Sequence, residues 1–419
     1  MDNNKRVKAG CYATNISMSV VGNLSPLLFV TFNKQYDISY SLLGLLVLVN
    51  FCTQLGVDLI FSFFSHKFNI PKTVKFTPVL TIIGLAIYAL FPLWLPNYAY
   101  VGIVIGTIVF SAASGLAEVL ISPVIAALPS DNPDHEMSKL HSIYAWGVVA
   151  VIGVSTVYLL LFGLTHWQWL ALLFVLVPLA ATLFFSGAQL PKMETPEKVS
   201  GALQFMKKKA LWLCVLAIFL GGASECTMAQ WCSSYLEKTL NVPNAKVFGD
   251  VFGAALFAVL LGLGRSLYAK YGKNIQKVLL LGAVGATACY IVAAVSNAPV
   301  LGLIACAFTG FCVSMLWPGS LIVASDKFPT GGVFIYAMMA AGGDFGASVA
   351  PQLVGVITDG VMAAPWAVEL AQNWGLTIEQ LGMKLGMSVG ILFPLMAVVV
   401  YFILWKSKVD KTKKACYTK

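Results

Sequence analysis

Long apolar runs, separated by short polar segments, fill this chain from near its first residue to near its last. A helix needs about 20 apolar residues to cross the hydrocarbon core of a bilayer, and twelve runs are long enough. We predict spans over 10–32, 40–65, 72–95, 99–128, 136–164, 167–186, 210–236, 247–270, 276–296, 299–323, 331–358 and 386–405. The polar start from Met1 to Lys8 does not fit a cleavable signal, so the first run is expected to remain as a helix. The predicted fold class is an all-α membrane protein.

Composition supports this class and adds an orientation. Hydrophobic residues make up 58% of the 419 positions and charged residues 11%, with a mean hydropathy of +0.82, whereas soluble domains carry about 25% charge. Of the 27 Lys and Arg residues, 23 fall on the side of the termini under the twelve-span prediction. Positive charge concentrates on the cytoplasmic side, so both termini are predicted in the cytoplasm, with the protein in the cytoplasmic (inner) membrane. Because the charge is scattered over short loops, nucleic acid is not an expected partner.

The spans divide six and six around a polar segment at 187–209, which contains Pro191 and Pro196. We therefore predict an N-terminal half at 1–186, a cytoplasmic linker at 187–209 and a C-terminal half at 210–419. A repeated spacing, G-x7-P-x6-S-D, supports two related halves. It occurs at Gly115, Pro123, Ser130 and Asp131, and again at Gly310, Pro318, Ser325 and Asp326. Two parallel six-helix halves are typical of the major facilitator architecture.

Four acidic residues lie inside the predicted spans: Asp58, Glu118, Glu225 and Asp344. A charge in the middle of a bilayer costs about 3 kcal/mol on insertion scales, so such a residue must be paired, protonated or facing water. Four of them in one bundle indicate a transport pathway, and all four are candidates for proton coupling. For each, a fixed structural pair with a neighbouring helix is the alternative.

Polar and aromatic side chains close to these acids are candidates for binding a solute. Glu225, Gln230 and Trp231 follow one another on predicted helix 7, and an acid, an amide and an indole suit a hydroxylated ring. A polar cluster that only packs helices is the alternative. The remaining substrate-binding candidates are Asn23, Glu118, His141, Trp146 and Trp317. His141 could also relay protons, and Asn15, Asn50, Gln54 and Gln352 are further amides within the spans.

The sequence does not indicate an enzyme or a cofactor. An intramembrane aspartyl protease needs G-x-G-D, whereas Ala341-Gly342-Gly343 precedes Asp344, and HExxH and phosphate-binding loop motifs are missing. The nine cysteines show no CxxC or Cys/His ligand spacing and are interpreted as packing residues, so no metal is expected.

Five short motifs in order resemble the fucose–galactose–glucose:proton symporter family, which includes fucose permeases, within the major facilitator superfamily. The matching stretches are Gly115-Leu116-Ala117-Glu118 with Pro123, Lys139-Leu140-His141-Ser142 with Gly147, Ala223-Ser224-Glu225 with Trp231 and Tyr235, Met315-Leu316-Trp317-Pro318, and Gly342-Gly343 with Pro351. The resemblance covers nearly all twelve spans. It implies that Glu118 carries the proton and senses the sugar, and that the cavity between the halves is sugar-sized.

The chain departs from this family at two places. Fucose permeases carry an aspartate in helix 1, and the corresponding position here is Pro26. The facilitator loop motif after helix 2 is degraded to Ser62-Phe63-Phe64-Ser65-His66-Lys67, while the matching later loop keeps Gly264-Arg265, where Arg265 is interpreted as a structural cytoplasmic latch.

The leading hypothesis is therefore a secondary active transporter that imports a monosaccharide, or a similar small hydroxylated solute, with protons. It is expected to act as a monomer in the lipid bilayer. The alternatives are an exporter of drug-like solutes, an uncoupled sugar uniporter and a non-transporting nutrient sensor. A sensor would be expected to carry a cytoplasmic domain longer than 187–209.

Overall fold

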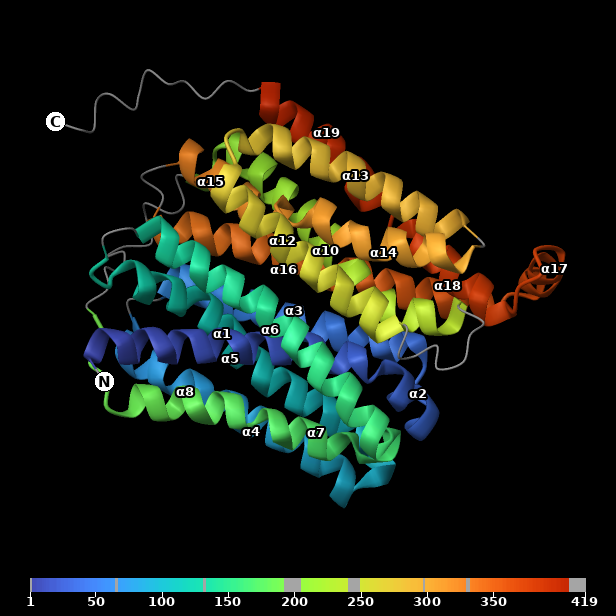
Figure 1. Ribbon diagram of the computed structural model, residues 1–419, viewed down its shortest axis with the longest axis horizontal. Coiled ribbons are helices and arrows are strands. Elements are labelled where there is room, and N and C mark those ends of the chain that lie inside the picture. The colour runs from blue at the N-terminus through green and yellow to red at the C-terminus, as the bar shows by residue number, and fades with distance from the viewer. Residues whose placement is uncertain are drawn as a thin grey trace.

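The computed structural model describes residues 2–64, 67–130, 133–191, 205–239, 249–296, 298–328 and 332–406, and these ranges are helical almost throughout (Figure 1). No strand occurs within them. The first part of the chain contains α1 (Asn3–Leu27), α2 (Phe29–Tyr36), α3 (Tyr40–Phe64), α4 (Ile70–Trp94), η2 (Pro96–Tyr98), α5 (Ala99–Ala126), α6 (Pro133–Phe162), η3 (Leu164–His166), α7 (Trp167–Phe174) and α8 (Leu176–Ser186). The second part contains α10 (Lys209–Thr239), the π-helix η4 (Gly249–Ala255), α12 (Leu256–Tyr271), α13 (Ile275–Val295), α14 (Pro299–Val313), α15 (Leu316–Lys327), α16 (Gly332–Met362), α17 (Pro365–Asn373), α18 (Ile378–Val389) and α19 (Leu392–Lys406).

The twelve predicted spans correspond to these helices. In the described residues, eleven helical segments are long and apolar enough to cross a membrane, and the bent pair α1–α2 brings the total to twelve. The bend is 46° and follows Pro26, because a proline lacks the backbone N–H and its ring clashes with the preceding turn. The predicted fold class is confirmed.

The last span differs from the prediction. It begins at Ile378, not at residue 386, and runs through α18 and α19 to Lys406. The sequence signal was weak there because Glu379, Gln380 and Lys384 interrupt the apolar run. The segment between the predicted spans 331–358 and 386–405 is largely helical: α16 continues to Met362, and α17 carries the exposed Trp366 beside the bundle end.

The helices form two groups that lie side by side (Figure 1). The first group, α1 to α8, is coloured blue to green, and the second group, α10 to α19, is coloured yellow-green to red. The start of α1 and the end of α19 lie at the same end of the bundle, which we call the terminal end. The end that holds α2 and α17 is called the opposite end.

Helices α3 and α16 form the main seam between the two groups. Near the opposite end, a methyl group at Gly355 of α16 would come within 2.6 Å of the Tyr40 carbonyl oxygen of α3. Near the terminal end, the rings of Phe63 and Phe334 are 6.0 Å apart. The two helices therefore run alongside one another over most of their length.

Glycines let α16 lie equally close to its neighbours in the second group. A methyl group at Gly346 would come within 2.0 Å of the Phe219 carbonyl oxygen of α10, and one at Gly343 would meet the Trp317 ring at 2.4 Å. Small residues allow such close backbone approach in membrane helices. Gly343 and Gly346, which flank Asp344, have this role.

We expect Gly346→Ala to destabilise the protein, because α10 or α16 must shift to admit a methyl group at this contact. The matched control is Gly360→Ala on the same helix, where nothing lies within 4 Å. There the substitution should be neutral or stabilising, since alanine is favoured over glycine in helices by up to about 1 kcal/mol. Thermal unfolding in detergent measures both, and equal melting temperatures for the two variants would contradict the close contact.

Candidate functional site

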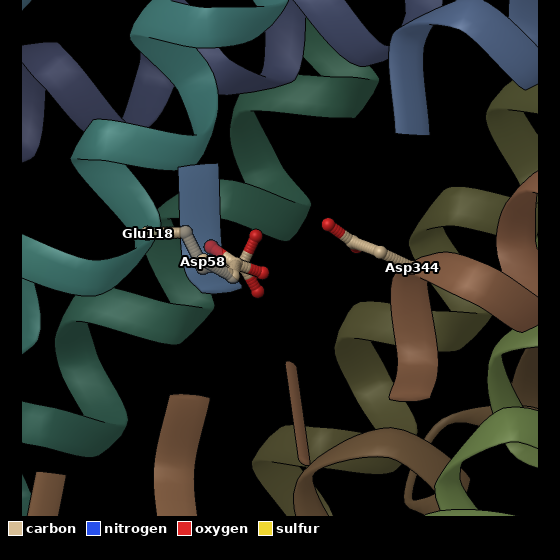
Figure 2. Close-up of side chains that lie close together, drawn as sticks. All are labelled: Asp58, Glu118 and Asp344. Atoms are coloured by element: carbon tan, nitrogen blue, oxygen red, sulfur yellow. The ribbon is translucent and has the colours of Figure 1, made fainter. Parts of the chain in front are cut away.

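Three of the four acidic residues come together at the seam. Asp58 from α3, Glu118 from α5 and Asp344 from α16 each offer a carboxylate oxygen, and these oxygens all lie within 4.8 Å of one another. In Figure 2, Asp58 and Glu118 lie on one side and Asp344 reaches toward them from the other. We call these residues the acidic cluster. Two members belong to the first group of helices and one to the second.

The cluster is enclosed by protein. The side chains of Asp58 and Asp344 are 0% and 1% exposed, and Glu118 is partly buried. Among the described residues, one carboxylate oxygen of Asp344 is buried without a hydrogen-bond partner. Like charges at this separation repel strongly in surroundings of low dielectric constant. The three groups therefore cannot all be ionised unless a cation joins them.

Glu225 takes a different position, in an ion pair. The guanidinium of Arg265 on α12 donates to both Glu225 carboxylate oxygens at 3.0 and 3.2 Å, and also to the Ser314 carbonyl oxygen at 3.0 Å. Both side chains are largely buried, at 15% and 12% exposure. The loop motif predicts Arg265 on the terminal side, near the end of the predicted span 247–270, whereas it lies inside α12 and pairs with the buried acid. This corrects its interpretation as a cytoplasmic latch.

Tyr144 of α6 lies near both the ion pair and the acidic cluster, and no sequence pattern selected it as a candidate. It lies within electrostatic range of Glu225, Arg265 and Glu118. A methyl group at Gly22 of α1 would be 3.3 Å from its hydroxyl oxygen. No sequence motif marks a single tyrosine in an apolar helix. Its proximity to the buried acids is therefore known only from the structure.

A small cavity lies further toward the opposite end, between α1, α3, α5 and α10. Its polar lining includes Ser25, Asn50, Thr107 and Gln230. Gln230 donates from its amide to the Gly22 carbonyl oxygen at 3.2 Å and so joins the two groups of helices. The cavity has room for about one water molecule, so a sugar does not fit in this conformation.

The other predicted binding residues are spread over several places. Trp231 is fully buried, its indole N–H donates to the Pro351 carbonyl oxygen at 2.9 Å, and its ring lies 5.2 Å from that of Phe29. Its N–H is therefore already used within the protein. Trp317 packs on Gly343, and Asn23 donates to the Ser19 carbonyl oxygen at 2.8 Å.

Two further candidates lie on α6. Trp146 of α6 is 49% exposed, and no interaction of its ring with the acidic cluster is observed among the described residues. His141 lies on α6 as well, but its side chain is outside the described residues.

At the opposite end, polar contacts join the two groups of helices. The Tyr40 hydroxyl donates to Glu379 at 2.5 Å, and the Ser41 backbone N–H donates to Asp359 at 2.6 Å. Lys34 and Glu237 form an ion pair at 3.5 Å. These contacts and the small cavity describe a conformation in which the opposite end is closed.

A polytopic helical bundle with buried acids at the seam between two groups of helices is typical of membrane transporters. Residues 10–351 match the model of the Major Facilitator Superfamily, and the chain belongs to this family. No curated protein matches the sequence.

Solved structures share the fold at low sequence identity. A bacterial homolog of the human lysosomal transporter Spinster is 13% identical, with a TM-score of 0.68 over 97% of this chain and 98% of the other. The D-xylose–proton symporter is 17% identical, with a TM-score of 0.67 over 96% of each chain. The E. coli fucose:proton symporter is 16% identical, with a TM-score of 0.59 over 94% of this chain and 99% of the other.

The Glu225–Arg265 pair can be tested by a double-mutant cycle. Removing one partner of a buried ion pair leaves an uncompensated charge and costs about 3–5 kcal/mol. Arg265→Met and Glu225→Gln should each lower the melting temperature, and the double variant should lose less stability than the sum of the two. Lys270→Met, at an exposed position of the same helix, is the control. Strictly additive effects would mean that the two side chains do not stabilise one another.

Proposed function

We propose that this protein is a secondary active transporter that imports a monosaccharide, or a similar small hydroxylated solute, together with protons. The observation that carries the proposal is the meeting of Asp58, Glu118 and Asp344 at the seam. The acidic cluster is the proposed proton site, with Glu118 as the coupling acid.

Ionised carboxyl groups are costly inside the enclosed acidic cluster. Three enclosed carboxyl groups whose oxygens lie within 4.8 Å must share protons or a cation. Loss of a proton would place like charges next to one another, and part of that repulsion would act between α3 and α16. Ionisation of the cluster would therefore favour separation of the two groups of helices at this level. Protonation would favour their contact, and this difference is what coupling requires.

The proposed solute class has two supports. The side chains lining the cavity are uncharged, and amide and hydroxyl groups recognise sugar hydroxyls by hydrogen bonds. The sequence motifs resemble the fucose permease family, and the fold is shared with proteins described as fucose and xylose symporters. Export of a drug-like solute remains the alternative, because apolar residues such as Val47 and Phe110 line the cavity beside its four polar side chains. An uncoupled uniporter and a non-transporting sensor are the remaining alternatives, and exchange of a labelled solute by the unmodified protein would exclude the sensor.

The proposed orientation places the terminal end, and with it both termini, in the cytoplasm. The chain would act as a monomer in the inner membrane, because both groups of helices come from one chain. In a bacterial host, green fluorescent protein fused after Lys419 should fluoresce, whereas alkaline phosphatase fused there should be inactive, since it needs an oxidising compartment for its disulfides. An active phosphatase fusion would invert the proposed orientation.

Glu118→Gln separates coupling from solute binding. Glutamine keeps the shape of the side chain but cannot release a proton. In proteoliposomes, the variant should still exchange labelled sugar across the membrane while losing accumulation driven by a pH gradient. Exchange needs only the loaded carrier to reorient, whereas accumulation needs a change of protonation in each cycle. The panel of solutes is L-fucose, D-xylose, uridine and dialanine.

The control is Glu369→Gln, the same substitution at an exposed position of α17. It should accumulate solute like the unmodified protein. A Glu118→Gln variant that still accumulates solute would exclude Glu118 as the coupling acid. If the unmodified protein accumulates solute only in a sodium gradient, the coupling ion is sodium and not the proton. If it exchanges solute but never accumulates it, it is a uniporter.

A further inference from the structure

We infer that Asn50, Thr107 and Gln230 form the solute-binding subsite, and that it binds an uncharged, polyhydroxylated solute. The inference rests on the proposed transport function and deepens it. Asn50 lies on α3, Thr107 on α5 and Gln230 on α10, and all three line the small cavity.

The first observation is that these buried groups have unused hydrogen-bonding capacity. The Thr107 hydroxyl is buried and has no partner among the described residues. The side-chain oxygen of Asn50 accepts from the Ser111 hydroxyl at 2.5 Å and from the Gln54 amide at 3.4 Å. This fixes the orientation of the Asn50 amide, whose nitrogen has no acceptor in the described part of the chain. A buried hydroxyl such as that of Thr107 is nearly always partnered, so a partner from outside the protein is expected there.

The second observation is that the subsite bridges the two groups of helices. Asn50 and Thr107 belong to the first group, and Gln230 to the second. The bond from Gln230 to the Gly22 carbonyl oxygen must break when α10 moves away from α1. That movement would enlarge the cavity and expose the Gln230 amide and the Gly22 carbonyl oxygen beside Asn50 and Thr107. Hydroxyl groups of a solute can then replace the bond that was lost.

The third observation concerns the chemistry of the ligand. Asn50 offers donors, the Gly22 carbonyl oxygen offers an acceptor, and Thr107 and Gln230 can act as either. No charged side chain lines the cavity in the described residues. This set matches neighbouring hydroxyl groups and leaves a carboxylate or an ammonium group without a counter-charge.

The subsite is separate from the acidic cluster. Thr107 and Glu118 are eleven residues apart on α5, about 16 Å and close to three helical turns. Asn50 and Asp58 are eight residues apart on α3, about 12 Å. Substitutions at the subsite should therefore change solute affinity without removing the response to a pH gradient.

The test measures exchange of L-fucose, D-xylose and uridine in proteoliposomes of the full chain, with dialanine as a non-hydroxylated probe. Thr107→Val keeps the shape of the side chain and removes the hydroxyl, and Asn50→Ala removes the amide. Each should raise the half-saturating concentration about fivefold or more, which corresponds to about 1 kcal/mol for one hydrogen bond. A pH gradient should still drive accumulation in both variants at saturating solute.

The matched control is Thr156→Val, since Thr156 is also buried with an unpartnered hydroxyl but lies away from the cavity. Its half-saturating concentration should not change. Thr107→Ser, which restores a hydroxyl, should lie close to the unmodified protein and shows that a loss in Thr107→Val is not misfolding.

Several results would overturn the inference. Unchanged affinity in both Thr107→Val and Asn50→Ala would assign the cavity to structural water. An unmodified protein that carries only dialanine would refute the hydroxylated class while leaving pH-driven transport intact. The unmodified protein could fail to accumulate solute in a pH gradient while Thr107→Val and Asn50→Ala still bind the solute more weakly. That result would refute proton coupling but not the subsite.

Discussion

The cost of placing charge inside an apolar bundle governs the arrangement of this protein. An isolated carboxylate in the hydrocarbon region is unfavourable by about 3 kcal/mol or more, so each intramembrane acid needs a specific solution. Glu225 is neutralised by Arg265 within the second group of helices. Asp58, Glu118 and Asp344 have instead been placed beside one another at the seam, where only a shared proton or cation can relieve their repulsion. The Glu225–Arg265 ion pair needs no proton to balance its charge, whereas the charge of the acidic cluster depends on how many protons it holds.

The seam between α3 and α16 makes that change mechanically relevant. Close packing along the two helices, with Gly355 against Tyr40 and Phe63 beside Phe334, means that they cannot separate at one level without strain elsewhere. The polar contacts at the opposite end involve the same helices, through Ser41 and Asp359. Under the proposed mechanism, repulsion within the acidic cluster would act through this packing on the contacts that join the two groups at the opposite end.

The sequence predicted the spans well, because the length of an apolar run is a direct consequence of bilayer thickness. It failed where polar residues interrupt a run, as at Glu379 and Lys384 before the last span. The sequence identified the four acids but could not say which of them would meet. Which acids meet depends on how α3, α5 and α16 are rotated about their own axes. That rotation is set by packing between residues that are far apart in the chain. For the same reason, it could not predict that Arg265 reaches Glu225 or that Trp231 uses its N–H on Pro351.

The two proposed sites are built from the same pair of helices, α3 and α5, and this gives a physical route for coupling between them. The acidic cluster takes Asp58 and Glu118 from α3 and α5, and the cavity takes Asn50 and Thr107 from the same two helices. These four positions are held at fixed spacing by the helices. Each site is completed by one residue of the second group, Asp344 or Gln230. A movement of the second group against the first would therefore alter both sites in a single step, since neither α3 nor α5 has to change shape. A proton bound at one level and a solute bound at the other would bias the same movement, which is the thermodynamic requirement for coupled transport.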